Sequence, residues 1–100
     1  IFQPHTYSRT ALLMQDFLEC FSACSPLIIY KTFPAREKYY KKGSARILYQ
    51  NLKLDKYKKV YYVKSKKEIE NVLLNLCIDY DKAVFLGAGD IYDLAKSITK

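Results

Sequence analysis

Two short stretches of the chain combine residue types that suit the binding of an anion. Residues 5–9 read His-Thr-Tyr-Ser-Arg and follow an apolar start that Pro4 closes. In α/β proteins, ligands are usually met where a strand ends and a helix begins. The amides of a helix start, together with a guanidinium, favour a carboxylate or a phosphate. His5 and Arg9 are therefore candidate binding residues, and a helix cap beside a surface arginine is the plainer alternative.

The second stretch, Gly87-Ala-Gly89-Asp90, follows the apolar residues 83–86. A dinucleotide-binding turn needs a third glycine and a later acidic residue that holds the ribose, and the sequence has neither. A close turn with Asp90 as a helix cap explains these residues better. The sequence also contains no P-loop, so we expect no tight ATP binding by these 100 residues alone.

A long polar loop is expected at residues 32–43, and it carries two further candidates. Loops of this length are uncommon in compact domains and are often functional. Arg36 and Glu37 lie near its centre. They form either an ion pair in solvent or part of a ligand site, and the sequence favours neither. No residue is assigned a catalytic role.

The apolar pattern predicts a strand–helix unit repeated four times, which is typical of a parallel α/β fold with helices on both faces of the sheet. The expected strands are residues 1–3, 27–30, 59–63 and 83–86. The expected helices begin at caps, namely Ser8 or Thr10 for a helix that runs to about Ser22, then Ser44, Ser65 with Glu68 as a capping box, and Asp90. The apolar positions expected at helical spacing are Leu12, Leu13, Phe17, Leu18, Phe21, Ile69, Val72, Leu73, Leu76, Ile91, Leu94 and Ile98.

The first expected strand is unusually short, at residues 1–3. We therefore expect residues 1–100 to be a single domain that lacks its first strand–helix unit and belongs to a longer protein. One hundred residues are too few for a second domain.

The chain is basic, with a formal net charge of +7 from 17 Lys and Arg against 10 Asp and Glu. Lysines cluster at residues 38–42, 53–59 and 64–67. A basic surface with interleaved tyrosines can bind nucleic acid through phosphate neutralisation and base stacking. Lys, Ile, Tyr and Asn are heavily used throughout the chain, however. Solvated lysines are therefore the simpler interpretation, and no specific nucleic-acid partner is expected.

The three cysteines make an odd number, and Cys20 and Cys24 lie four apart on an expected helix, with Cys77 distant in sequence. We expect free thiols, as in a reducing cytoplasm, and no metal site. No apolar run has the length of a membrane span, and no charged start precedes an apolar stretch as in a secretory signal. A cytoplasmic protein without a membrane partner is expected.

Several of these motifs recur together in one enzyme family. The stretch Phe2–Arg9 closely resembles a motif of the C-terminal domain of the UDP-N-acetylmuramate–L-alanine ligases, members of the Mur ligase family. Further matches follow in the family's order, at Pro34–Glu37, at Gly43 and at Gly87–Ile91. The resemblance covers the whole chain, and the first motif is the most specific part of it.

The resemblance implies a Rossmann-like three-layer sandwich with a mostly parallel sheet, acting as the amino-acid-binding lid of a three-domain enzyme. Such an enzyme adds L-alanine to UDP-N-acetylmuramate in peptidoglycan synthesis. Its ATP and Mg²⁺ are bound mainly by a central domain outside these residues, so none is expected here and the isolated chain is expected to be inactive.

The resemblance also assigns roles to single residues. In the family, the His and Arg of the first motif help to place the amino acid and the anionic intermediate, which carries over to His5 and Arg9. Arg36 and Glu37 are expected to bind substrate as well. Thr6 stands where some members have Arg, and the family's Tyr-Gly/Ala-His-His-Pro segment is absent. A non-enzymatic Rossmann-like module that binds a nucleotide or a protein partner is the alternative.

Overall fold

Two short parallel strands form the centre of the fold. In the computed structural model, which describes residues 1–54, 59–76 and 82–98, β1 (Leu27–Tyr30) pairs with β2 (Val60–Val63). Leu27 faces Val60 at one end of the pair, and Tyr30 faces Val63 at the other. Both strands were expected from the sequence, and their parallel pairing confirms the expected α/β class. Parallel strands need a crossover, which α3 (Ala45–Leu52) supplies.

The first residues of the chain extend this pair on its other side. Phe2 forms parallel bridges with Ile29 of β1 and with Leu86. The Phe2 amide donates to the Ile28 carbonyl oxygen at 2.8 Å, and the Gln3 amide donates to the Leu86 carbonyl oxygen at 2.9 Å. The expected strands at residues 1–3 and 83–86 are thus present as hydrogen-bonded extended segments with isolated bridges, not as full strands.

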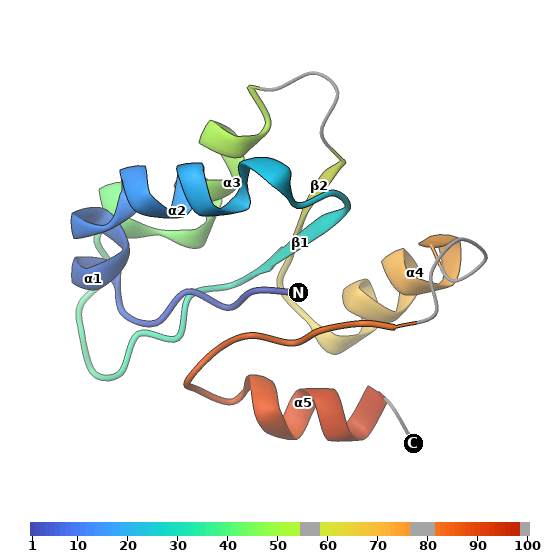
Figure 1. Cartoon of the computed structure of the whole chain (residues 1–100). Coiled ribbons are helices and arrows are strands. Elements are labelled where there is room, and N and C mark those ends of the chain that lie inside the picture. The colour runs from blue at the N-terminus through green and yellow to red at the C-terminus, as the bar shows by residue number, and fades with distance from the viewer. Residues whose placement is uncertain (55–58, 77–81, 99–100) are drawn as a thin grey trace.

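The first half of the chain forms α1 (Tyr7–Leu12), α2 (Met14–Cys20) and α3, and α2 and α3 cover one face of β1, as Figure 1 shows. Leu27 and Ile29 point to this side, and they belong to a cluster of buried residues with Leu48 and Phe21. Phe21 lies in the short 3-10 helix η1 (Phe21–Ala23). Because side chains alternate along a strand, the other two residues of β1 must point to the opposite face.

That opposite face is covered by α4 (Lys66–Leu76) and α5 (Ile91–Ile98), which lie together on the other side of the sheet in Figure 1. Ile28 and Tyr30 are buried there with Ile69 and Ile91. The remaining apolar positions expected on these helices also pack against this cluster or are partly buried: Val72, Leu73, Leu76, Leu94 and Ile98. The expected inward faces of the last two helices are confirmed.

The first helical region differs from the expectation of one helix that runs to about Ser22. α1 ends at Leu12, Leu13 leaves the helical conformation (φ −102°, ψ 15°), and α2 starts at Met14. The hydrogen bonds from the Leu13 amide to Arg9 and from the Phe17 amide to Leu13 continue across the break. The break redirects the apolar stripe, so that α2 contacts the core while Leu12 is 83% exposed.

Two of the expected helix caps are confirmed. Ser44 caps α3, since its hydroxyl accepts from the Ile47 amide at 3.3 Å. Ser65 accepts from the Glu68 amide at 3.2 Å, and Glu68 in turn accepts from the amide of Lys64 at 2.7 Å, one residue before the cap.

Cys77 and part of the 53–59 lysine cluster lie outside the described residues. Across the described ranges, no helix combines the length and the hydropathy that a bilayer crossing requires.

Candidate functional site

The first candidate stretch continues the line of the sheet beyond the end of β1. The Phe33 amide donates to the Pro4 carbonyl oxygen at 2.9 Å, and the Thr6 amide donates to the Phe33 carbonyl oxygen at 2.8 Å. His5 and Phe33 thereby form a parallel bridge. Residues 4–6 are fixed against the start of the loop that follows β1, which we call the 31–40 loop.

The cap of α1 is Thr6, and not Ser8 or Thr10 as expected. The Thr6 hydroxyl accepts from the Arg9 amide at 3.3 Å. Ser8 lies inside the helix, and Thr10 is buried there with its hydroxyl donating to the Thr6 carbonyl oxygen at 2.8 Å. The helix begins earlier because a side chain from the 31–40 loop binds the amides of its first two residues, a contact between residues distant in sequence.

That side chain is Glu37. Its Oε1 accepts from the Tyr7 amide at 2.7 Å and from the Ser8 amide at 3.0 Å, while its Oε2 accepts from the Ser8 hydroxyl. The hydrogen bond from the Ser8 hydroxyl, together with those from the two amides, lowers the pKa of Glu37. The first turn of α1, which the sequence suggested for an external anion, is therefore occupied by a carboxylate of the chain itself.

A tight turn aims Glu37 at α1. The Glu37 amide donates to the Pro34 carbonyl oxygen at 3.0 Å, and the two residues between them, Ala35 (φ 49°) and Arg36 (φ 75°), are both left-handed. Thr6 (φ 62°) shares this property, and these are the residues other than glycine with positive φ in the described part of the chain. Residues in this region of conformational space are strained and cluster at functional sites. In the described part of the chain, these strained residues thus lie on the two sides of the contact between the 31–40 loop and α1.

His5 connects the two candidate stretches. Its ring stacks on Phe33, with the ring centroids 5.5 Å apart and the planes at 19°. The ring of Phe33 lies directly against Gly89, where an added Cβ would come within 2.4 Å of it. Gly89 has an ordinary negative φ, so its role is to leave room for an aromatic ring and not to permit a turn.

Gln3 is a member of the site that the sequence analysis missed. It is 1% exposed, and its Nε2 donates to Asp90 Oδ1 at 2.8 Å and to the Lys31 carbonyl oxygen at 3.3 Å. The Asp90 carboxylate also lies near Tyr30, whose pKa is raised by burial and then by that charge. Gln3 thus ties the start of α5 to the end of β1. A polar residue inside an apolar strand is the signal that could have identified it.

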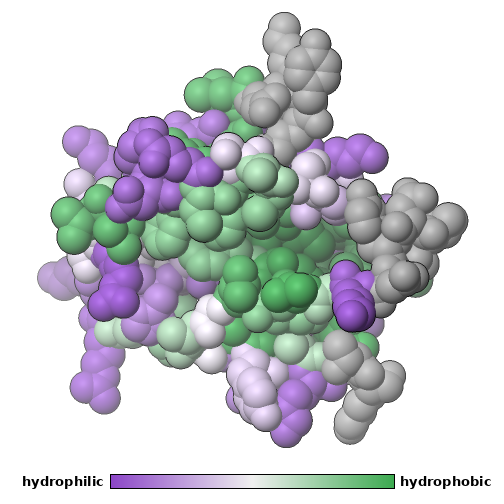
Figure 2. All heavy atoms as spheres, in the orientation of Figure 1, coloured by the Kyte–Doolittle hydropathy of each residue, from purple (hydrophilic) through white to green (hydrophobic). Residues whose placement is uncertain are grey.

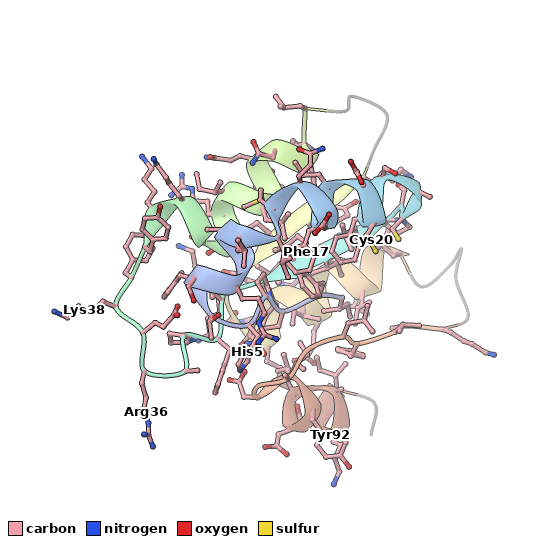
Figure 3. The ribbon with its side chains drawn as sticks, turned by 60° about the vertical axis from the view of Figure 1, so that its left-hand side comes forward. His5, Phe17, Cys20, Arg36, Lys38 and Tyr92 are labelled. Atoms are coloured by element: carbon pink, nitrogen blue, oxygen red, sulfur yellow. The ribbon has the colours of Figure 1, made fainter. Side chains whose placement is uncertain are left out.

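Not every predicted site residue is gathered here. His5, Glu37 and the first turn of α1 are in contact through the interactions above. Arg9 is exposed on that same turn. Figure 3 shows that His5 lies inward while Arg36 and Lys38 extend from the loop into solvent. Arg36 and Glu37 therefore point in different directions, and the ion pair considered for them does not describe the structure.

The 31–40 loop is also held by the residues at its C-terminal end. The short 3-10 helix η2 (Lys41–Gly43) follows it and packs against α1. A Cβ added to Gly43 would lie 1.8 Å from the Tyr7 carbonyl oxygen, so only glycine allows this approach. The ring of Tyr7 meets Tyr39 edge to face at a centroid distance of 5.4 Å. These contacts make the 31–40 loop a fixed partner of α1.

An apolar pocket of about 610 Å³ lies at the other end of the strands. Figure 2 shows apolar side chains gathered on this face of the molecule, around the region where Figure 1 places the N-terminus. Ile1, Pro26, Leu27, Leu73 and Val84 are among the residues of its wall. Its wall is mostly apolar and includes neither His5 nor Glu37.

Metal-ligating side chains are not grouped in the described ranges, where His, Cys, Asp and Glu form no cluster of three or more. Cys20 and Cys24 are exposed free thiols. The arrangement around α1 provides one imidazole, one exposed guanidinium and an ionised carboxylate that is already bound. These groups have the chemistry to bind a charged small molecule.

Comparison with known proteins gives one consistent result along the whole chain. The chain is 36% identical over 100 residues to the UDP-N-acetylmuramate–L-alanine ligase of Lachnospira eligens. It is 38% identical over 96 residues to that of Caldanaerobacter subterraneus subsp. tengcongensis, and 30% identical over 96 residues to that of Hydrogenovibrio crunogenus. The chain is homologous to a segment of UDP-N-acetylmuramate–L-alanine ligase.

The match to these ligases is a match to part of each enzyme. These alignments cover between 96% and 100% of the chain but only 21% to 22% of each ligase. The chain therefore spans about a fifth of the length of the curated relatives. No family model matches the chain. The family resemblance drawn from the sequence motifs is confirmed at the level of this segment.

Proposed function

We propose that residues 1–100 are a single C-terminal domain of a UDP-N-acetylmuramate–L-alanine ligase, acting in the cytoplasm to place the incoming amino acid. The observation that carries the proposal is the similarity of the whole chain to one segment of these ligases, at 30% to 38% identity. The motif Phe2–Arg9 is part of the aligned chain, and the structure fixes it beside the 31–40 loop.

A Rossmann-like three-layer sandwich is the architecture we propose for the complete domain. It is supported by the parallel hydrogen bonding of four segments, in the order β2, β1, residues 1–3 and residues 84–86, and by helices on both faces. In such sheets, ligands bind beyond the carboxyl ends of the strands. His5, Arg9 and the 31–40 loop lie at this edge, which supports a role for them in binding a ligand.

In the proposed reaction, ATP activates the muramyl carboxylate as an acyl phosphate, which the amine of L-alanine attacks. His5, Arg9 and Arg36 would face the carboxylate of L-alanine and the negative charge that develops in the reaction. Glu37 lies beside them on the 31–40 loop, bound to the first turn of α1. A preorganised cation stabilises such a charge most where water is excluded. The chain spans about a fifth of the length of its relatives, and we assign ATP and Mg²⁺ to other parts of such an enzyme.

The test is a domain exchange. In a chimera of the Lachnospira eligens ligase, residues 1–100 replace the homologous segment, and phosphate release is measured with ATP, Mg²⁺, UDP-N-acetylmuramate and L-alanine. We expect alanine-dependent phosphate release from the chimera and none from residues 1–100 alone, because the reactants must be held together. A chimera that folds and binds ATP but does not respond to L-alanine would reject the proposal and favour a binding module.

A further inference from the structure

The contact between Glu37 and α1 indicates a role for this residue that differs from substrate binding. We propose that Glu37 is a positioning residue, whose carboxylate clamps the 31–40 loop onto the first turn of α1 and leaves substrate contact to His5, Arg9 and Arg36. The functional part of this inference rests on the proposed ligase function. The structural part, the clamp itself, stands on the contacts of the chain alone.

Both oxygens of Glu37 are already used. Oε1 accepts two backbone amides, of Tyr7 and Ser8, and Oε2 accepts the Ser8 hydroxyl. Hydrogen bonds to an ionised acceptor are stronger than neutral ones, and they hold the carboxylate in one orientation. A substrate ammonium would have to compete with this arrangement, so the geometry favours a fixed internal partner.

The backbone on both sides of the contact is consistent with a clamp. Ala35 and Arg36 on the loop side and Thr6 on the helix side hold positive φ. Strained backbone of this kind persists only where surrounding contacts impose it. The Glu37 contact is one that joins the two strained segments directly. The same turn sends Arg36 outward, so the clamp also sets the direction of that guanidinium.

The charges around Glu37 allow its titration to report on the clamp. The hydrogen bonds from Ser8 and Tyr7 lower the pKa of Glu37, and the charge of His5 lowers it by a smaller amount. Arg36 and Lys38 extend outward, and Lys41 and Lys42 on η2 are exposed. Because the pKa is lowered on folding, the clamp is complete above the ordinary pKa of a glutamate and is lost as the pH falls through the lowered value.

The clamp is tested on the 100-residue chain by recording amide chemical shifts from pH 7 downward. We expect the amides of Tyr7 and Ser8 to titrate together, with a midpoint below the ordinary pKa of a glutamate. Glu37→Gln should remove this titration, while Glu70→Gln, at an exposed position of α4, should preserve it. The proposal would be overturned if the chemical shifts of these two amides did not change with pH, or if they changed in Glu37→Gln as they do in the parent chain.

The positioning role is tested in the chimeric ligase. A glutamine can still accept both amide bonds, so we expect Glu37→Gln to retain kcat/KM for L-alanine within about threefold, whereas Glu37→Ala loses about tenfold or more. The KM for ATP should not change in either variant. An equal loss in both variants would show instead that the negative charge binds the substrate. An inactive parent chimera would reject the ligase function, while the amide titration would still decide the clamp.

Discussion

The two strand–helix junctions of the chain, residues 4–9 and 87–91, meet at Phe33 but are held in different ways. The first is fixed by polar contacts with a loop about thirty residues away, chiefly those of Glu37 with Tyr7 and Ser8. The second is fixed by the close packing of Gly89 against the Phe33 ring and by the hydrogen bond from Gln3 to Asp90. The comparison shows that the glycines of such a turn can serve packing, beside one hydrogen bond at Asp90, whereas the hydroxyl- and arginine-containing turn carries the strained backbone and the contacts of Glu37.

The local parts of this design could be predicted from the sequence. The Ser44 cap and the Ser65–Glu68 capping box each depend on residues within four positions of one another, and both were confirmed. The strand at 27–30 was equally clear, because four consecutive apolar residues follow Pro26. Local spacing is enough where the partners are neighbours in the chain.

The features that the sequence analysis missed or predicted wrongly depend on contacts between residues far apart in sequence. Thr6 is the cap of α1 because Glu37 satisfies the amides that follow it, and no local pattern reveals that contact. Gln3 binds Asp90, which lies 87 positions away. The break at Leu13 lies between α1, whose first turn binds Glu37, and α2, whose apolar side chains pack against the core. Tertiary contacts decided each of these outcomes.

The largest effect on stability is expected at Gly43, where the backbone of η2 packs against the backbone of α1. Gly43→Ala should lower the free energy of unfolding by about 3 kcal/mol or more, because its Cβ would lie 1.8 Å from the Tyr7 carbonyl oxygen and α1 would have to move. Urea denaturation measures the loss. If Gly43→Ala lowered the free energy of unfolding by less than Gly89→Ala, the first junction would not tolerate an added Cβ less well than the second.

At the second junction, backbone meets a side chain, so a smaller effect is expected. Gly89→Ala should cost about 2 kcal/mol, because the Phe33 ring can move aside in part. Combining Gly89→Ala with Phe33→Leu should recover some of this stability, since the smaller side chain leaves room for the Cβ. A double-mutant cycle gives the coupling energy. Strictly additive losses would show that the two residues are not in the predicted conflict.

A smaller effect is expected at the cap of α1. Thr6→Ala should cost about 1 kcal/mol, because it removes the acceptor of the Arg9 amide and keeps a Cβ at positive φ. Thr6→Gly should be closer to the parent chain, since glycine accepts this conformation without strain. Thermal unfolding of the two variants side by side gives the order. Equal losses would show that the backbone at Thr6 carries no strain.

The most direct test of the central claim, that the first junction serves the amino acid, compares two exposed arginines in the chimeric ligase. Arg9→Ala should lower kcat/KM for L-alanine about 30-fold or more, as expected for the loss of a cation from an anion site, with thermal stability almost unchanged. Arg46→Ala, on the exposed side of α3, should leave the kinetics unchanged. Identical behaviour of the two variants would contradict the account.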